Sequence, residues 1–438
     1  MKKALSLLLI VGFALCVAGF VGEASAETKK ILWWSHWANE PSKRNVIERV
    51  AKDYMEAHPD VEIEITWWDK QPLQDAWRTV VAANGEGGPD IVTDPAQDIV
   101  EQVRAGIFLD LGEDFPWENF APGTKEGAQF GGVPGYYKFN IGKSIHMIFY
   151  NKQIFEEAGI TVPEDYTFTQ DEFVEVVKKV SDLGYAGVAD AIGNRPYPAL
   201  FPIFDALADL VGTEKMQQYM AGSTSWDTPE ARQVLEWMVE LREAGFWPKT
   251  FATMTIDEFH VYFHTQHKAA MLYIPSWYTG RAFQPEEKGG QSPDFHFGML
   301  RYPRMNGAEG EQTVVGGFES GYVISKWTEH PDVARDILKF FAQPKYGALW
   351  ELYTDIPSVI KYTQADIPAD APETKWGWYH EEIAKVYGPL PMGLFNRNLG
   401  VSGDFLNARE TVLNQGLPQG LVTVEEAIEM LNEHVEEE

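Results

Sequence analysis

Three histidines stand at a spacing that could hold a metal ion. His260, His264 and His267 follow the i, i+4, i+7 pattern, which places three imidazoles on one face of a helix, as a zinc site would require. The sequence offers no evident partner that would orient these rings. We therefore favour the alternative, that they are ordinary solvated side chains, and expect no bound metal.

Hydrolysis is a second kind of chemistry to consider. A glycosidase needs two carboxylates flanking the bond that it cleaves, and among 65 acidic residues a pair can always be imagined. Composition therefore does not decide for or against an enzyme. The sequence has no P-loop, no GxGxxG and no GxSxG motif, so it predicts neither nucleotide binding nor a serine nucleophile, and we expect no cofactor.

A site that holds a neutral sugar without reacting with it is a third possibility to consider. A neutral sugar ring has an apolar face, which can stack on a flat side chain, and a rim of hydroxyls, which pair with carboxylates and amides. The chain has 15 tryptophans to serve as platforms. Ligands of open α/β sheets collect at the carboxyl ends of the strands, so residues that follow predicted strands are the candidates.

Strands and helices alternate in the elements that would position such residues. Residues 31–34 and 61–65 read as strands, and between them residues 46–54 carry apolar side chains at helical spacing. This strand, helix, strand unit predicts an α/β fold with a doubly wound sheet. Further helix starts are predicted at Thr169, where a capping box begins, at Pro229, at Pro331 and at Thr423.

The first 26 residues read as a cleavable export signal. Lys2 and Lys3 precede an apolar run, and Ala24-Ser25-Ala26 provides the small residues of a cleavage site. An uncleaved membrane anchor is the alternative, and the cleavage site makes it the weaker one. The single cysteine, Cys16, lies inside this segment behind bulky Leu15, so we expect no lipid anchor and no disulfide in the mature chain.

Charge and length limit the remaining function classes. Removing two lysines and one glutamate of the leader from 36 basic and 65 acidic residues leaves 34 and 64, a net charge near −30. A chain of this charge repels nucleic acid and anionic lipid, so neither is expected as a partner. About 412 residues exceed what one hydrophobic core usually serves, and two lobes are therefore predicted.

Several runs, in order along the chain, resemble one protein family. Residues 148–160 read IFYNKQIFEEAGI, which is similar to the YNK-x-x-F-x-x-AGI signature of extracellular solute-binding proteins that serve ABC importers, in particular the sugar-binding, maltose-binding-protein-like family 1. The other matching runs are GPDIV at 88–92, AGIFLDL at 105–111, KAAM at 268–271 with the following Trp277, GG at 316–317, and the helix 331–341 with the later Ile356-Pro357.

The resemblance implies a fold, a function and a place. The fold would be the type II periplasmic binding protein fold, two α/β lobes of discontinuous segments joined by a hinge. By order along the chain, residues 27–140 plus 303–350 would form the first lobe and 141–300 plus 355–438 the second, with hinges near 139–143 and 299–303. The protein would be a periplasmic monomer that captures a sugar or oligosaccharide by lobe closure and delivers it to permease subunits in the inner membrane.

The resemblance also suggests ligand contacts, several of which follow predicted strands. Trp277 is the main candidate, because the family stacks an aromatic residue on the sugar after its AAM strand. The full set of expected contacts is His36, Trp37, Asp94, Gln97, Ser144, Tyr197, Trp277, Tyr278, Gly317, Phe318 and Glu319. Two alternatives remain open at this point: a secreted glycoside hydrolase, and a binding protein for a non-sugar solute such as a polyamine.

Overall fold

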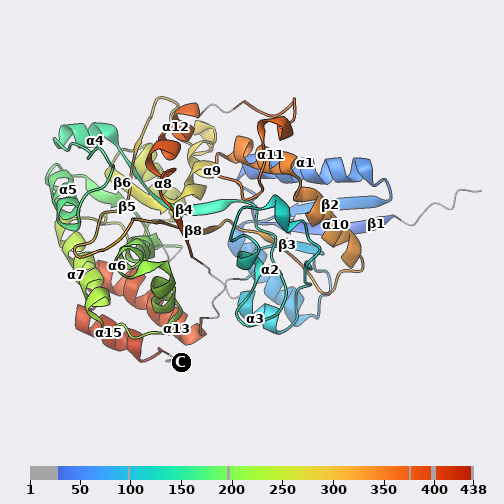
Figure 1. The fold of residues 1–438 in the computed structure, drawn as a ribbon, viewed down its shortest axis with the longest axis horizontal. Coiled ribbons are helices and arrows are strands. Elements are labelled where there is room, and N and C mark those ends of the chain that lie inside the picture. The colour runs from blue at the N-terminus through green and yellow to red at the C-terminus, as the bar shows by residue number, and fades with distance from the viewer. Residues whose placement is uncertain (1–27, 97–98, 195–197, 374–375, 396–400, 436–438) are drawn as a thin grey trace, which may run out of the picture.

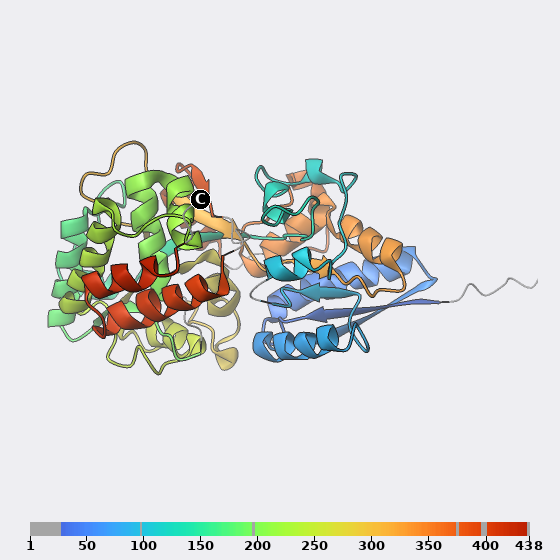
Figure 2. The same cartoon turned by 90° about the horizontal axis from the view of Figure 1, so that it is seen from below.

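Two β-sheets organise the molecule (Figure 1), and each is flanked by helices. The computed structural model describes residues 28–96, 99–194, 198–373, 376–395 and 401–435. Among these residues no helix combines the length and the apolar character needed to cross a membrane. The predicted α/β fold with two lobes is confirmed, and Figure 2 shows the lobes side by side from a second direction.

The first lobe is built on a four-stranded sheet of order β2-β1-β3-β9. Its strands are β1 (Lys29–Ser35), β2 (Val61–Trp67), β3 (Ile91–Thr93) and β9 (Tyr322–Ile324). The first three run parallel, and β9 is antiparallel to β3. The helices of this lobe are α1 (Pro41–Ala57), α2 (Lys70–Ala82), α3 (Ile99–Arg104), α10 (Pro331–Phe341) and α11 (Pro344–Thr354).

The second lobe contains a larger sheet, of order β10-β8-β4-β6-β5, in which β7 also pairs with β4. Its strands are β4 (Lys143–Tyr150), β5 (Ala186–Ala189), β6 (Ala269–Pro275), β7 (Gly298–Leu300), β8 (Val314–Phe318) and β10 (Met392–Leu394). Its longer helices are α5 (Gln170–Asp182), α6 (Phe201–Ala221), α7 (Pro229–Ala244), α8 (Ile256–His264), α12 (Gly377–Val386) and α15 (Val424–Asn432). The shorter ones are α4 (Lys152–Glu157), α9 (Thr279–Ala282), α13 (Gly403–Arg409), the π-helical Glu410–Gly416 and α14 (Leu417–Gln419).

Local sequence explains where several of these elements begin. Thr169 caps α5 by accepting a hydrogen bond from the Glu172 backbone N–H, while the Glu172 carboxylate accepts one from the Thr169 backbone, which completes the predicted capping box. The same reciprocal pair opens α15 at Thr423. In the YNK run, the buried Asn151 side chain accepts from two backbone N–H groups and thereby starts α4 directly after β4.

Within the described residues the chain passes between the lobes at three places. The first is at residues 139–143, where Phe139 still bridges to Tyr322 of the first lobe and Lys143 already begins β4. The second is the short segment between β8 and β9. The third follows α11, because Ile356 packs in the core of the first lobe and Tyr379 in that of the second.

Two of these passages lie later in the chain than the predicted boundaries. Residues 314–318, which the sequence prediction assigned to the first lobe, form β8 and pair with β4 in the second sheet. The passage therefore falls at 319–321 rather than near 299–303. Likewise, residues 356–360 pack on the first lobe, although the second was predicted to resume at 355. Both assignments rested on segment order, whereas strand pairing decides lobe membership.

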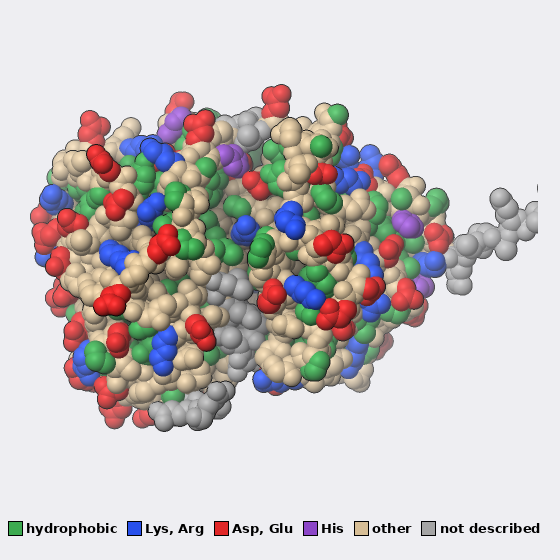
Figure 3. All heavy atoms as spheres, in the orientation of Figure 1, with side chains coloured by type: hydrophobic (Ala, Val, Ile, Leu, Met, Phe, Trp, Pro, Cys, Tyr) green, Lys and Arg blue, Asp and Glu red, His purple; other side chains and the backbone are tan. Residues whose placement is uncertain are grey.

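Acidic side chains are spread over the visible surface of both lobes (Figure 3), as the net charge of −29 for the full sequence requires. Basic side chains are interspersed among them on this face. An acidic surface of this kind favours solubility and disfavours polyanionic partners.

Candidate functional site

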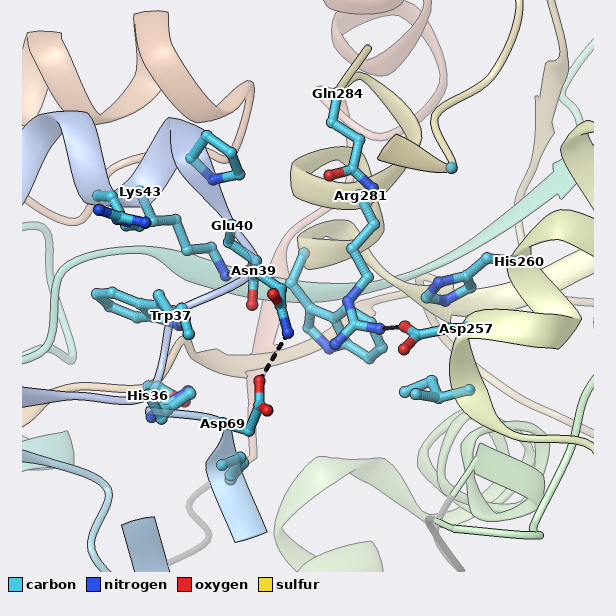
Figure 4. Close-up of a pocket in the computed structure, with 18 of the residues that line it drawn as sticks. His36, Trp37, Asn39, Glu40, Lys43, Asp69, Asp257, His260, Arg281 and Gln284 are labelled. Carbon is cyan, nitrogen blue, oxygen red and sulfur yellow. Dashed lines mark hydrogen bonds and ion pairs between the residues drawn. The ribbon is translucent and has the colours of Figure 1, made fainter. Parts of the chain in front are cut away.

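A cavity of about 720 Å³ lies between the two lobes, and residues of both lobes line it. Its volume is in the range of sites that enclose small ligands. From the first lobe come the segments that follow β1 and β2, and from the second come parts of α8, α9 and the turn after β6 (Figure 4). The first-lobe residues thus lie at the carboxyl ends of parallel strands, where α/β sheets bind their ligands.

Trp277 lies where the lobes meet. Its indole is partly exposed, lines the cavity and packs against the hydrophobic cores of both lobes. The neighbouring Tyr278, in the same short turn Ser276–Tyr278 after β6, points into the core instead of the cavity. Its ring is fully buried beside Phe149 and Phe297, and its hydroxyl hydrogen-bonds to His264. The expected ligand contact of Tyr278 is therefore corrected to a position in the core.

A buried ion triad supports the first-lobe wall. The Lys43 ammonium lies 2.7 Å from a Glu40 carboxylate oxygen and 3.1 Å from one of Glu319, and it stands 5.1 Å from the centre of the Trp37 ring. Burial opposes its charge, but the two carboxylates outweigh burial and raise the pKa of Lys43. For Glu40, burial is likewise outweighed by Lys43 and Arg281, so its pKa falls to about 2. Lys43 and Glu40 are therefore both charged at neutral pH.

The other expected ligand contacts that the structure describes divide into those that line the cavity and those that do not. His36, Trp37, Ser144, Phe318 and Glu319 line the cavity, as Trp277 does. Asp94 and Gly317 are not among the lining residues; the Asp94 carboxylate is held 2.7 Å from the Lys138 ammonium, and Gly317 is a buried position in β8 that pairs with Ser144. Gln97 and Tyr197 lie outside the described residues.

His36 is a neutral group in this cavity. Burial, and next the positive charge of Lys70, lower the pKa of its imidazole to about 3. Its Nδ1 atom is buried and has no hydrogen-bond partner among the described residues. A neutral imidazole of this kind can exchange hydrogen bonds with an uncharged polar ligand.

Several polar lining residues were not predicted. On the first lobe, Asp69 and Lys70 follow β2, and Asn39 donates a hydrogen bond of 2.6 Å to Asp69 (Figure 4). The rule that selected His36 after β1 would have found them after β2. On the second lobe the missed residues are Asn194, Asp257, His260, Arg281, Gln284 and Lys288. Those on α8 and α9 carry no local signal, because only the packing of the lobes brings these helices to the cavity.

The sequence prediction for the three histidines was that they are ordinary solvated side chains. They do not share one ligand: His264 hydrogen-bonds to Tyr278 and to the Gly289 carbonyl, and His267 pairs with Asn151. No cluster of three metal-ligating side chains is found in the described part of the chain. They are not solvated surface residues, however, because His260 and His264 are 2% and 1% exposed.

Comparisons with known proteins agree with this architecture. An arabinooligosaccharide-binding protein of Halalkalibacterium halodurans is 25% identical over 50% of this chain and 44% of its own length, so the alignment spans less than half of that relative. A maltotriose-binding protein of Pyrococcus abyssi is 28% identical over 79% of this chain and 67% of its own length.

Solved structures share the fold at lower sequence identity. A structure from a study of xylan utilization by Caldanaerobius polysaccharolyticus has a TM-score of 0.74 at 18% identity, covering 93% of this chain and 100% of that one. A sugar transporter protein of Bacillus licheniformis in complex with stachyose has a TM-score of 0.66 at 17% identity, covering 93% and 99%.

A family model described as bacterial extracellular solute-binding protein matches residues 49–375, which include every strand of the two sheets except β1 and β10, and most of the cavity lining. The match covers well over half of the chain. The chain belongs to the bacterial extracellular solute-binding protein family.

Proposed function

We propose that the protein is the substrate-binding component of an ABC transporter and captures a sugar or oligosaccharide between its lobes. The observation that carries the proposal is the partly exposed Trp277 indole at a cavity that both lobes line with carboxylate, amide and imidazole groups. An aromatic face beside both hydrogen-bond donors and hydrogen-bond acceptors fits a sugar ring. The two sequence relatives, which are named for arabinooligosaccharide and maltotriose binding, support the same ligand class.

Lobe closure supplies the mechanism. A ligand that binds one lobe and then completes its hydrogen bonds with the other favours the closed state by its difference in affinity for the two states. The three chain passages lie between the sheets and would act as the hinge. A permease in the inner membrane would recognise the closed form, and ATP hydrolysis would take place on a partner subunit.

The export signal and its position fit this role. Cleavage after Ala26 would release a periplasmic protein without a lipid anchor, since Cys16 lies within the removed segment. The protein would act as a monomer and perform no reaction on its ligand. Incubation with an oligosaccharide that it binds should therefore release no new reducing ends, whereas a secreted glycosidase would release them.

A binding screen tests the proposal. Maltotriose, arabinotriose, raffinose and stachyose are each added to the purified mature protein while its melting temperature is recorded, with spermidine as the cationic comparison. A sugar at 100 times its Kd stabilises the folded state by about 2.7 kcal/mol, which a melting curve resolves. A shift with spermidine alone, or with none of these solutes, would count against sugar as the ligand.

Substitution of the proposed platform sharpens the test. We expect Trp277→Ala to weaken binding of the stabilising sugar at least about tenfold, because a lost aromatic contact of about 1.4 kcal/mol corresponds to that factor. Trp117→Ala is the matched control, since Trp117 is also partly buried but lies in the first lobe away from the cavity. Calorimetric titration of both variants gives the comparison, and equal affinities would remove Trp277 from the site.

A further inference from the structure

His260 differs from every other histidine that the structure describes. It is 2% exposed, it lines the interlobe cavity, and neither of its ring nitrogens has a hydrogen-bond partner in the described part of the chain. Buried polar groups are nearly always paired, and an unpaired one costs stability. A side chain with two unpaired nitrogens at a binding cavity therefore suggests that its partner is a ligand.

The residues around His260 hold its ring in place but form no hydrogen bond with its two nitrogens. Aromatic rings enclose it: the centre of the Phe259 ring lies 4.5 Å away, that of Tyr278 5.2 Å away and that of Trp277 6.0 Å away. Burial is the main reason that its pKa lies well below the usual range, and the nearby His264 lowers it further. The imidazole is therefore neutral, with one nitrogen that donates and one that accepts a hydrogen bond.

A charged pair stands on the cavity side of this ring. Asp257, one turn earlier on α8, pairs with Arg281 of α9, and Figure 4 shows the His260 ring directed from α8 toward these two side chains. The pair is accessible, since 77% of the Asp257 side chain and 27% of that of Arg281 are exposed. A ligand that competes for the pair can therefore displace it and reach the imidazole behind it.

We propose that His260, Asp257 and Arg281 surround Trp277 as a subsite for an uncharged sugar ring, in which the His260 imidazole both donates to and accepts from ring hydroxyls. This inference rests on the proposed function and narrows its ligand class. Asp257 and Arg281 cancel each other in charge and the imidazole is neutral, so the subsite as a whole offers no excess charge to a ligand. A hydroxyl is both a donor and an acceptor, which matches the two nitrogens of one neutral imidazole. A uronic acid or a polyamine would leave one of the paired charges without its counterpart.

We expect substitution of His260 to lower the affinity for the sugar without lowering the stability of the ligand-free protein. His260→Phe keeps a ring of similar size among the same aromatic neighbours and removes two unpaired polar atoms. The ligand-free variant should therefore melt at the same or a higher temperature than the original protein. Its affinity for the sugar identified in the screen of maltotriose, arabinotriose, raffinose and stachyose should fall by at least about tenfold, because the hydroxyl loses its partner.

Two further variants serve as controls. His260→Gln retains one donor and one acceptor, so it should recover part of the lost affinity. His264→Phe, one turn along the same helix, removes hydrogen bonds to Tyr278 and Gly289 instead, so it should lower the melting temperature of the ligand-free protein and leave the affinity nearly unchanged. The ligand class is tested with trigalacturonic acid and spermidine, neither of which should match the neutral sugar in affinity.

The outcomes separate the inference from the proposed function. If no sugar binds to the unmodified protein, the proposed function fails. If a neutral sugar binds but His260→Phe binds it equally well, or if trigalacturonic acid binds more tightly than every neutral sugar, the subsite is refuted while the binding function stands.

Discussion

At the scale of single residues, the most demanding feature is the buried charge of the ion triad in the cavity wall. Lys43 is 3% exposed, and its ammonium contacts Glu40 and Glu319, which lie far apart in the sequence. Buried ion groups are strongly destabilising when one partner is removed, because the remaining charges stay in a poorly solvated place. Glu319 lies on the passage between β8 and β9, so the triad also fixes the hinge segment against α1.

Replacement of Lys43 should reveal this dependence. Lys43→Met leaves two buried carboxylates without their cation, and we expect a loss of about 3–5 kcal/mol in the free energy of unfolding. Lys52→Met, on the same helix, removes an exposed ion pair with Glu56 and should change stability by less than about 1 kcal/mol. Urea titration of both variants measures the difference, and similar losses in the two would contradict the buried-triad interpretation.

The residues also show what sequence reasoning can find. His36 and Trp37 after β1 and Trp277 after β6, which the sequence prediction selected as ligand contacts, line the cavity. Strand ends are visible in the hydrophobic pattern, which is why these positions could be selected. The choice between Trp277 and Tyr278 could not be made from the sequence, because it depends on the rotation of one short turn after β6. His260 was noticed only as a possible metal ligand, since its two unpaired nitrogens become apparent only once its neighbours are known.

At the scale of elements, helix starts are the most local features of this fold. The capping residues Thr169, Thr255 and Thr423 each form the reciprocal pair with a glutamate three positions later. This signal needs only four consecutive residues, which is why the starts of α5 and α15 were predictable. The YNK run is also a local signal: Asn151 caps α4, and Tyr150 packs on Phe155. The residues of this run therefore position a helix and do not line the cavity.

The cap of α5 gives a test at this scale. Thr169→Ala removes the hydroxyl that accepts from the Glu172 backbone, and we expect a loss of about 1 kcal/mol in unfolding free energy with sugar affinity unchanged, since α5 is remote from the cavity. Thr169→Ser keeps an accepting hydroxyl and should retain most of the stability. Thermal melts of the two variants provide the measurement, and a serine variant as unstable as the alanine variant would argue against the cap.

At the scale of the whole molecule, a few polar contacts join the lobes beside the chain passages. The Thr279 hydroxyl of α9 lies 3.3 Å from the carbonyl oxygens of Thr354 and Asp355, where α11 ends. His380 of α12 approaches the Asp355 carboxylate at 2.7 Å. Gly280 places α9 close to the ion triad, since a Cβ at this position would lie at ordinary van der Waals distance from Glu40 and Lys43. These contacts depend on tertiary arrangement and had no counterpart in the sequence prediction.

The pair between His380 and Asp355 should make stability depend on pH. The hydrogen bond that the His380 imidazolium donates to the Asp355 carboxylate raises the pKa of His380 above its ordinary value of 6.5. Burial opposes this rise, and the negative charges of Asp355 and Glu351 support it. Since the folded-state pKa is the higher one, the stabilisation is complete below pH 6.5 and is lost as the pH rises through the folded-state value. Melting temperatures of the original protein and His380→Gln should therefore differ most near pH 5.5 and converge toward pH 8.5. A difference that grows with pH would contradict this assignment.

The pairing of β9 with β3 has a consequence for the order in which the molecule folds. Residues 91–93 emerge early during synthesis, but their antiparallel neighbour comes more than 200 residues later, and the entire second-lobe sheet apart from β10 is made in between. Pairing between such distant segments requires closing a long loop and is slow. The sheet of the first lobe therefore stays incomplete until residues 322–324 have been made, about three quarters of the way along the chain. A ribosome-bound fragment ending before residue 322 should be much more sensitive to protease than the full-length protein.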